Sequence, residues 1–458
     1  MASLFPDGDG ACRLLDAGAG IGSLSAAFLD RWTAGGFHFS QVAVDAFELD
    51  HVLVEYLAQT LGEYAHRNDF SHDIHEEDFI HAAVESRMGS LFAKPLKPYT
   101  HAILNPPYKK INSSSAHRLA LSRVGIETVN LYSAFVALAV ALAAPKGQIV
   151  AIIPRSFCNG PYYRPFRDFI LERAAIRHIH LFDSRSKAFK DDSVLQENII
   201  ILLERDAHQG SVTVSTSTDD TFTDLSSHEY PFDRIVLPDD TECFIHVPTS
   251  REPDSIEQCP KIRCTLADLG IKVSTGPVVD FRLKEHLREM PEPGTVPLLY
   301  PAHFTGQSAT WPIEGMKKPN AIERNGDTEK WLYASGFYCV VRRFSSKEEK
   351  RRIMASVVDP SAFGDAPMLG FENHLNVFHT NKQGLPEPLA RGLALFLNTT
   401  AVDAFFRRFN GHTQVNATDL KNMKFPSREL LIQLGTRAMR QGTYTQDWID
   451  AQLGSLTE

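Results

Sequence analysis

The sequence lacks the features that mark metal-binding, disulfide-rich and membrane proteins. Its six cysteines form no CxxC pair, and its eighteen histidines form no HExxH motif or comparable ligand spacing. We therefore expect reduced thiols and no metal site. No apolar run approaches the length that spans a bilayer, and the first ten residues contain no basic region typical of a signal peptide. These absences predict a cytoplasmic protein with no membrane partner.

The chain also lacks an overall excess of basic residues, since its formal net charge is −9. Residues 1–100 hold 15 acidic and 6 basic residues, so the remainder is neutral. Basic residues gather there in two groups, Arg155, Arg164, Arg167, Arg173 and Arg177, and Arg342, Arg343, Lys347, Lys350, Arg351 and Arg352. Local basic surface binds phosphate whatever the overall charge, so each group predicts either a phosphate-binding surface or an ordinary solvated helix face.

The most informative stretch is Asn105-Pro106-Pro107-Tyr108, which follows the apolar run 101–104. That run is too short for a helix, and two prolines end it as a strand, so the stretch lies at a strand's carboxyl end, where α/β sheets bind ligands. The side-chain oxygen of Asn105 and the carbonyl of Pro106 are acceptors suited to one NH2 group. Pro107 stiffens the turn, and Tyr108 offers a face to a flat ring. A proline-rich turn without a ligand is the alternative.

A glycine turn ends the first predicted strand. Asp16 closes that strand, and Gly18, Gly20 and Gly22 follow before a helical pattern begins. The glycines allow a ligand to approach the backbone closely, and Asp16 can accept from an ammonium or hydroxyl group. The spacing D-x-G-x-G-x-G differs from the fingerprint GxGxxG, which argues against NAD. A glycine-rich turn that binds nothing is the alternative.

Acidic residues also follow the next two predicted strands. Glu48 comes after the apolar strand 41–47, in a position suited to ribose hydroxyls. Asp78 follows the third strand and can accept from an exocyclic amine, while Phe79 can pack against a base. We interpret the histidines of this stretch as solvated loop residues rather than ligands.

The ordered set of glycine turn, ribose acid, Asp-Phe pair and Asn-Pro-Pro-Tyr resembles the gamma-class amino-methyltransferases of DNA. The similarity continues through residues 130–135, 155–162, 182–189, 300–304, 343–350, 371–376 and 410–420. On these segments the chain is identified as a member of the PstI/BsuBI-type modification methylases of type II restriction–modification systems. The resemblance implies an α/β fold, with a Rossmann-like S-adenosylmethionine-dependent methyltransferase sheet and a C-terminal mixed α+β target-recognition domain.

The resemblance also implies how the cofactor would be held. The glycine turn and Asp16 would bind the methionine part of S-adenosylmethionine, and Glu48 would bind its ribose. Asp78 and Phe79 would bind its adenine, with Phe135 closing over that ring.

By the same resemblance, the target adenine would be flipped out of double-stranded DNA into the site. Asn105 and Pro106 would accept hydrogen bonds from its N6 amine, which attacks the methyl group directly, so no nucleophilic residue is needed. Tyr108 would stack on the flipped base and Phe189 would contact its other side. The choice of adenine N6 over cytosine N4 rests on the resemblance, because both targets are amines.

The expected domains are a catalytic domain over residues 1–240 and a DNA target-recognition domain over 241–458. The Ser/Thr/Asp-rich stretch 210–260 is the expected boundary region, and one amphipathic helix is expected over 388–408. Methylation would protect DNA from a cognate restriction endonuclease that acts on the same site, with no direct contact implied.

Several alternatives stay open. The chain could methylate a protein glutamine or RNA, or it could be a DNA-binding specificity protein that needs a partner for activity. In the family, a Thr-Pro-containing segment upstream of the glycine turn covers the methionine end of the cofactor, and Phe5-Pro6 is at best its remnant here. We therefore expect a truncated start, a piece supplied by another chain, or weak cofactor binding.

Overall fold

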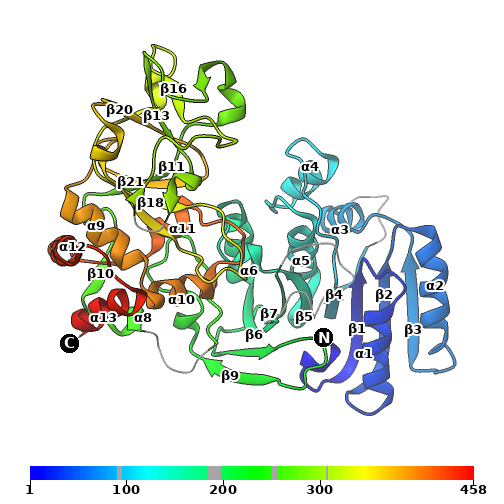
Figure 1. Ribbon diagram of the computed structural model, residues 1–458. Helices are drawn as coiled ribbons and strands as arrows, with labels where there is room; N and C mark the ends of the chain where they lie inside the picture. Colours follow the sequence, from blue (N-terminus) through cyan, green and yellow to red (C-terminus); the bar gives the residue numbers. More distant parts are fainter. Residues whose placement is uncertain (90–94, 183–196, 250–254, 306–307, 458) are drawn as a thin grey trace. The chain divides into compact units, whose positions relative to one another are not determined.

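The computed structural model describes residues 1–89, 95–182, 197–249, 255–305 and 308–457 of the chain (Figure 1). The chain folds into two compact units, Met1–Arg251 (unit 1) and Glu252–Glu458 (unit 2). Unit 1 continues past residue 240, the predicted end of the catalytic domain. There Ile245 is buried, and its N–H donates to the carbonyl of Cys158.

Unit 1 is built on a nine-stranded mixed sheet with the order β3-β2-β1-β4-β5-β7-β6-β8-β9. Its strands are β1 (Asp9–Ala17), β2 (His38–Phe47), β3 (Phe70–His75), β4 (Tyr99–Leu104), β5 (Ala143–Pro154), β6 (Ala174–Phe182), β7 (Asn198–Arg205), β8 (Val212–Ser217) and β9 (Ser226–Tyr230). The first five strands are parallel, and β7 runs antiparallel between β5 and β6. The strand order reverses between β1 and β4, so the preferred ligand position is the carboxyl end of these two strands. This is the α/β methyltransferase-type sheet that the sequence predicts.

Helices cover both faces of this sheet. They are α1 (Ser23–Thr33), α2 (His51–Gly62), α3 (Phe79–Met88), α4 (Ala116–Arg123), α5 (Leu131–Leu142) and α6 (Arg164–Arg173). Successive strand residues point to opposite faces, so Leu14 packs in the core under α1 and α2, while Leu15 packs in the core under α3, α5 and α6. Burial on both faces explains why the central strands are apolar runs.

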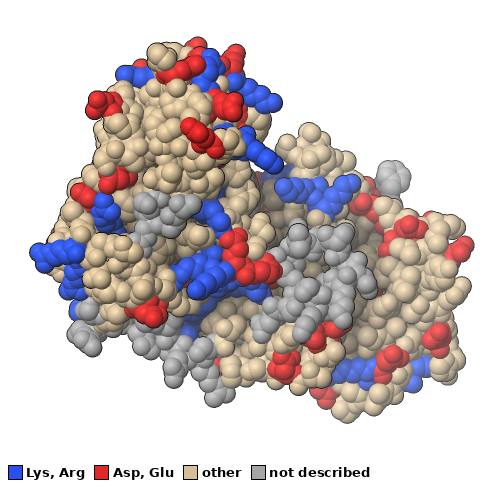
Figure 2. Space-filling model, in the orientation of Figure 1, with Lys and Arg blue, Asp and Glu red and all other residues tan. Residues whose placement is uncertain are grey.

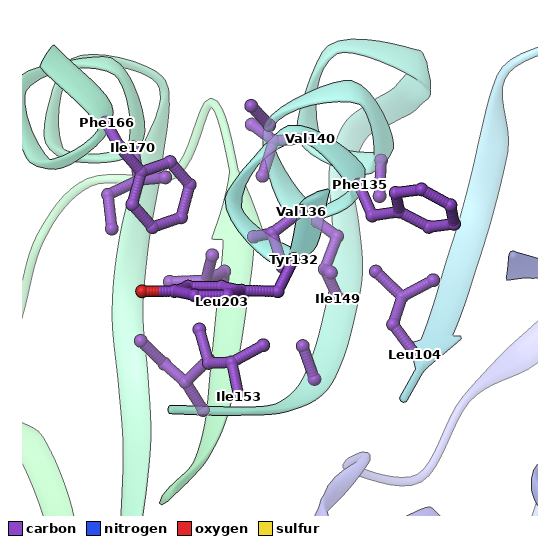
Figure 3. Close-up of a cluster of buried hydrophobic side chains, with 14 of the residues drawn as sticks. Leu104, Tyr132, Phe135, Val136, Val140, Ile149, Ile153, Phe166, Ile170 and Leu203 are labelled. Atoms are coloured by element: carbon purple, nitrogen blue, oxygen red, sulfur yellow. The ribbon is translucent and has the colours of Figure 1, made fainter. Parts of the chain in front are cut away.

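Helix α5 forms the centre of the larger core. Every residue from Tyr132 to Leu142 is buried, which requires a helix that is apolar all round. Figure 3 shows its side chains packed onto strands and onto α6, with Tyr132, Phe135, Val136 and Val140 near Leu104, Ile149, Ile153, Leu203, Phe166 and Ile170. This packing fixes the first turn of α5, and with it Phe135.

Strand β5 contains an irregularity near its start. Tyr99 pairs with Ala143 and His101 pairs with Gln148, so the intervening residues bulge inside the strand. Lys146 takes a left-handed conformation there, with φ of 63°. The pairing on both sides of the irregularity depends on β4.

Unit 2 contains short strands in several small sheets. Its four-stranded sheet has the order β11-β21-β18-β19, its five-stranded sheet has the order β12-β16-β13-β20-β17, and β10-β22 and β14-β15 are pairs. The strands are β10 (Ile262–Cys264), β11 (Lys272–Thr275), β12 (Leu287–Arg288), β13 (Thr295–Leu299), β14 (Phe304–Thr305), β15 (Ser308–Ala309), β16 (Ala321–Glu323), β17 (Tyr333–Ala334), β18 (Tyr338–Arg342), β19 (Ala355–Val358), β20 (Met368–Phe371), β21 (Leu375–His379) and β22 (Phe425–Pro426).

The helices of unit 2 are α8 (Ser255–Gln258), α9 (Glu387–Leu397), α10 (Thr400–Phe409), α11 (Ala417–Asn422), α12 (Arg428–Gln441) and α13 (Gln446–Thr457). The single helix predicted over 388–408 is wrong, because α9 and α10 meet at 63°. Thr399 starts the second helix, since its side-chain oxygen accepts from the N–H of Val402. Within the described residues, no single helix is long and apolar enough to cross a membrane; α9 and α10 reach that length and composition only as this bent pair.

Helices α9 and α12 cross at two glycines. A Cβ placed on Gly435 would lie 1.7 Å from the carbonyl oxygen of Pro388. A Cβ on Gly392 would lie 1.8 Å from the carbonyl oxygen of Leu431. The two backbones are therefore so close that only hydrogen fits at these positions.

Not all residues of the two predicted basic groups lie on the surface. Arg155, Arg167 and Arg352 are buried. The guanidinium of Arg167 donates to three backbone carbonyls, and that of Arg155 pairs with Glu197. The prediction is wrong for these three, because a guanidinium can satisfy buried carbonyls as well as phosphates. On the face shown in Figure 2, basic and acidic side chains are interspersed.

Candidate active site

The glycine turn, the Asn-Pro-Pro-Tyr turn and the start of α5 meet at the carboxyl end of β1 and β4. A Cβ placed on Gly18 would lie 3.6 Å from Cε1 of Phe135 and 3.9 Å from Cδ of Pro107. Gly18 has φ of 75°, a conformation that glycine adopts without strain. The structure therefore brings together residues from three predicted motifs that lie far apart in the sequence.

Asp16 lies under the glycine turn and is fully buried. Its Oδ2 accepts from Oγ of Ser25 at 2.7 Å, whereas its Oδ1 has no hydrogen-bond partner among the described residues. Burial raises the pKa of this carboxyl group to about 6, with a smaller contribution from the charge of Glu48. A buried carboxylate oxygen without a partner fits a ligand that brings an ammonium or hydroxyl group, as the methionine part of S-adenosylmethionine does.

We expect Asp16 to make the cofactor-free protein less stable as pH rises. Its pKa is raised from 3.8 to about 6 by folding, so its stabilising contribution is complete below pH 3.8 and is lost as pH passes through 6. An Asp16→Asn variant should therefore gain about 2 kcal/mol on the wild type between about pH 4 and about pH 7, out of about 3 kcal/mol for the whole shift at 1.36 kcal/mol per pKa unit. Urea unfolding at the two pH values measures this difference, and an equal pH dependence in both proteins would contradict it.

Glu48 ties the end of β2 to the glycine turn. Its Oε2 accepts from the N–H of Gly20 at 2.8 Å, and its Oε1 accepts from the N–H groups of Leu49 and Asp50. The N–H groups of Gly18 and Ala19 donate to the carbonyl of Phe47, each at 2.9 Å. These bonds orient the Glu48 carboxylate beside the turn, where its remaining lone pairs can accept from ribose hydroxyls.

Asp78 is the N-cap of α3. Its Oδ1 accepts from the N–H of His81 at 3.0 Å, and its Oδ2 lies 2.8 Å from Nε2 of His117. Phe79 is buried, with its ring centroid 5.1 Å from that of Phe135. The Asp-Phe pair thus lies beside Phe135, as a site for a flat ring requires.

The interpretation of nearby histidines as solvated loop residues is wrong for three of them. His72 is half-buried inside β3, His75 is buried at the end of that strand, and His81 is half-buried on α3. Sequence reasoning also missed Ser25 as the partner of Asp16 and His117 as the partner of Asp78. Neither carries a local signal, because each meets its carboxylate only through the packing of a helix.

The Asn-Pro-Pro-Tyr turn presents its acceptor to solvent. The Asn105 side chain is exposed, and its Oδ1 accepts from the Tyr108 hydroxyl at 3.2 Å. The Tyr108 ring is half-buried against Tyr132, with centroids 6.2 Å apart. Tyr108 thus helps to hold Asn105, while Oδ1 keeps a second lone pair for a ligand. Phe189, the predicted contact on the other side of the base, lies outside the described residues.

Substitution of Gly18 should abolish cofactor binding. A Gly18→Val side chain would point at Phe135 and Pro107, and a residue with Cβ at φ of 75° costs about 1–2 kcal/mol. Gly10→Val is a matched control, because Gly10 has φ of 72° at the other end of β1 and a Cβ there meets nothing within 4 Å. Calorimetric titration with S-adenosylmethionine should show binding by the control alone, and binding by both variants would contradict the placement.

The chain is similar to known restriction-modification methyltransferases. Residues 58–189 match the model of the Eco57I restriction-modification methylase family. The chain is 55% identical over 438 residues to the type II methyltransferase M.BsuBI of Bacillus subtilis, covering 95% of this chain and 87% of the relative. It is 43% identical over 457 residues to the type II methyltransferase M.PstI of Providencia stuartii, covering 98% and 89%.

A solved structure shares the fold at low identity. The type IIL restriction-modification enzyme MmeI, solved in complex with DNA, aligns over 97% of this chain and 69% of its own, with a TM-score of 0.54 and 10% identity. The sheet, the glycine turn and the acceptor turn define an S-adenosylmethionine-dependent methyltransferase. The chain belongs to the family of type II restriction–modification DNA methyltransferases that includes M.BsuBI and M.PstI.

Proposed function

We propose that the protein methylates the N6 amine of adenine at a specific site in double-stranded DNA. The observation that carries this proposal is the exposed Asn105 acceptor at the carboxyl end of β4, on the turn whose Pro107 lies beside Gly18 and Phe135. An amine bound here would face two acceptors, Asn105 Oδ1 and the Pro106 carbonyl, and would lie next to the glycine turn.

The proposed cofactor-binding residues lie at the carboxyl edge of the sheet. Asp16 would satisfy its unpartnered Oδ1 with the ammonium group of the methionine part. Of the three glycines, Gly20 leaves room for it, since a Cβ there meets nothing within 4 Å, whereas Gly22 packs against Leu57 and Thr60 of α2. Glu48 would accept from the ribose hydroxyls. Asp78 and Phe79 would bind the adenine ring of the cofactor, and Phe135 would cover it.

The chain's part in the reaction is positioning and polarisation. S-adenosylmethionine supplies a methyl group on a sulfonium sulfur, which leaves with the electron pair of the broken bond. Asn105 Oδ1 and the Pro106 carbonyl accept from the target amine and turn its nitrogen lone pair toward that methyl group. Tyr108 would stack on the flipped base, and Phe189 would contact its other face. The methylated amine then gives up its extra proton to water.

The expected target-recognition domain, 241–458, is proposed to recognise the DNA target through unit 2, Glu252–Glu458, because the residues before Glu252 belong to unit 1. The likeness to MmeI, which was solved with DNA, extends over 97% of this chain and supports that role. A cognate restriction endonuclease that cuts the same unmethylated site is the proposed counterpart. Both would act in the cytoplasm, on DNA of the nucleoid.

The test is to identify the methylated nucleoside. The purified chain is incubated with tritiated S-adenosylmethionine and unmethylated bacterial DNA, and the DNA is digested to nucleosides. We expect the label in N6-methyldeoxyadenosine. Label in N4-methyldeoxycytidine would overturn the choice of adenine, and unlabelled DNA from a protein that binds the cofactor would overturn the proposed activity.

A further inference from the structure

Three potential metal ligands lie together beside the cofactor residues of unit 1. Asp78 and His81 lie at the start of α3, and His117 lies in the first turn of α4. One ligand atom from each of the three lies within 4.8 Å of the other two. All three residues are half-buried, and the ring centroids of His81 and His117 are 5.1 Å apart.

The separations suit a small ion. Zinc binds imidazole nitrogen and carboxylate oxygen at about 2.0–2.2 Å, with three protein ligands and one open position in exchangeable sites. Asp78 Oδ2 and His117 Nε2 are now 2.8 Å apart, the distance of a hydrogen bond. Two ligand atoms of a tetrahedral zinc ion lie about 3.4 Å apart. If an ion replaced the proton of this hydrogen bond, the two atoms would therefore have to separate by only about 0.5 Å.

The donor set also selects the ion. Two imidazoles and one carboxylate favour late first-row divalent cations, whereas Mg²⁺ and Ca²⁺ prefer oxygen ligands alone. The backbone N–H of His81 already fixes Asp78 through Oδ1, which leaves Oδ2 directed at His117. We propose that Asp78, His81 and His117 form a binding site for a late first-row divalent cation, of which Zn²⁺ is the example we would test.

Occupation of this site would control cofactor binding. This step rests on the proposed function, in which Asp78 accepts from the adenine amine of S-adenosylmethionine. A cation on Asp78 Oδ2 removes that acceptor and places positive charge beside it. Metal and cofactor would therefore weaken each other's binding by the same factor, as linkage requires.

The metal site is tested without the cofactor. The full chain, stripped with a chelator, is titrated with Zn²⁺ by calorimetry and with Co²⁺ by visible absorption, which reports tetrahedral coordination. We expect one ion per chain, and His81→Ala and His117→Ala should each weaken binding at least about tenfold, the lower limit for losing an outer-shell partner. His66→Ala, an exposed histidine on the same unit, is the control and should bind as the wild type does. Equal affinity in all four proteins would overturn the site.

The link to the cofactor is tested separately. S-adenosylmethionine is titrated into the wild type with and without saturating Zn²⁺, and the same is done with His117→Ala. We expect Zn²⁺, at a concentration that saturates the wild type but not the variant, to weaken cofactor binding at least about tenfold in the wild type and by a smaller factor in the variant. If Zn²⁺ binds at these residues and cofactor affinity is unchanged, the metal site stands and the control of cofactor binding is overturned, together with the proposed role of Asp78.

Discussion

An Asn105→Ala variant is expected to lose methyl transfer by a factor of about 10² to 10³, the usual cost of removing one preorganised polar group from a transition state. The variant removes the side-chain acceptor and leaves the Pro106 carbonyl, so the target amine loses half of its polarising contacts. Single-turnover transfer of tritium from S-adenosylmethionine to DNA measures the rate of this step directly. Affinity for the cofactor should change little, because the Asn105 side chain hydrogen-bonds to Tyr108 rather than to Asp16, Glu48 or Asp78 in the part of the chain that the structure describes.

Asn112→Ala is the matched control for this experiment. Asn112 is also exposed and lies in the loop after the Asn-Pro-Pro-Tyr turn, and only its backbone carbonyl accepts, from Ser115. Its variant should transfer methyl groups as the wild type does. Full activity of Asn105→Ala, or equal loss in both variants, would show that the Asn105 side chain does not polarise the target.

Gly435→Ala is expected to cost unit 2 about 3 kcal/mol or more in free energy of unfolding, the upper range for overpacking a core. The added methyl group would lie 1.7 Å from the carbonyl oxygen of Pro388, so α9 and α12 must move apart. The better helix propensity of alanine, about 1 kcal/mol, does not offset this. Urea unfolding followed by circular dichroism measures the loss, and Gly392→Ala should behave alike because the same crossing is blocked.

The control is Gly454→Ala in α13 of the same unit. A Cβ there meets nothing within 4 Å, so the variant should keep or gain up to about 1 kcal/mol of stability. If Gly435→Ala and Gly454→Ala unfold at the same urea concentration, the close crossing does not exist in solution.

The sheet of unit 1 could be predicted because its strands are buried on both faces. Runs such as 101–104 and 148–154 are apolar without alternation, and prolines or glycines mark where they end. Gly18 and Pro107 follow the carboxyl ends of β1 and β4, so strand direction alone places them at one edge, whereas Phe135 lies on α5 and only the resemblance implied its position. Their roles toward cofactor and base stay predictions.

Unit 2 could not be predicted in the same way. Its strands have two to five residues, and many of their partners are distant in the sequence, as with Lys272 and His379 or Leu298 and Gly370. Strands this short carry no readable period, and pairing over such distances leaves no local pattern. The bend between α9 and α10 was missed because the cap at Thr399 interrupts a pattern that is amphipathic on both sides.

The pairing of β1 with β4 also determines when the candidate active site can form while the chain is being translated. Leu14 pairs with His101, and the two strands are separated in the chain by β2 and β3. A nascent chain that ends before Tyr99 lacks β4 and the Asn-Pro-Pro-Tyr turn, so it has no acceptor turn to place beside the glycine turn. Non-local pairing of this kind is a slow step in folding. The acceptor turn therefore takes its place only after β4 has been synthesised and has paired with β1, although β1 and the glycine turn leave the ribosome first.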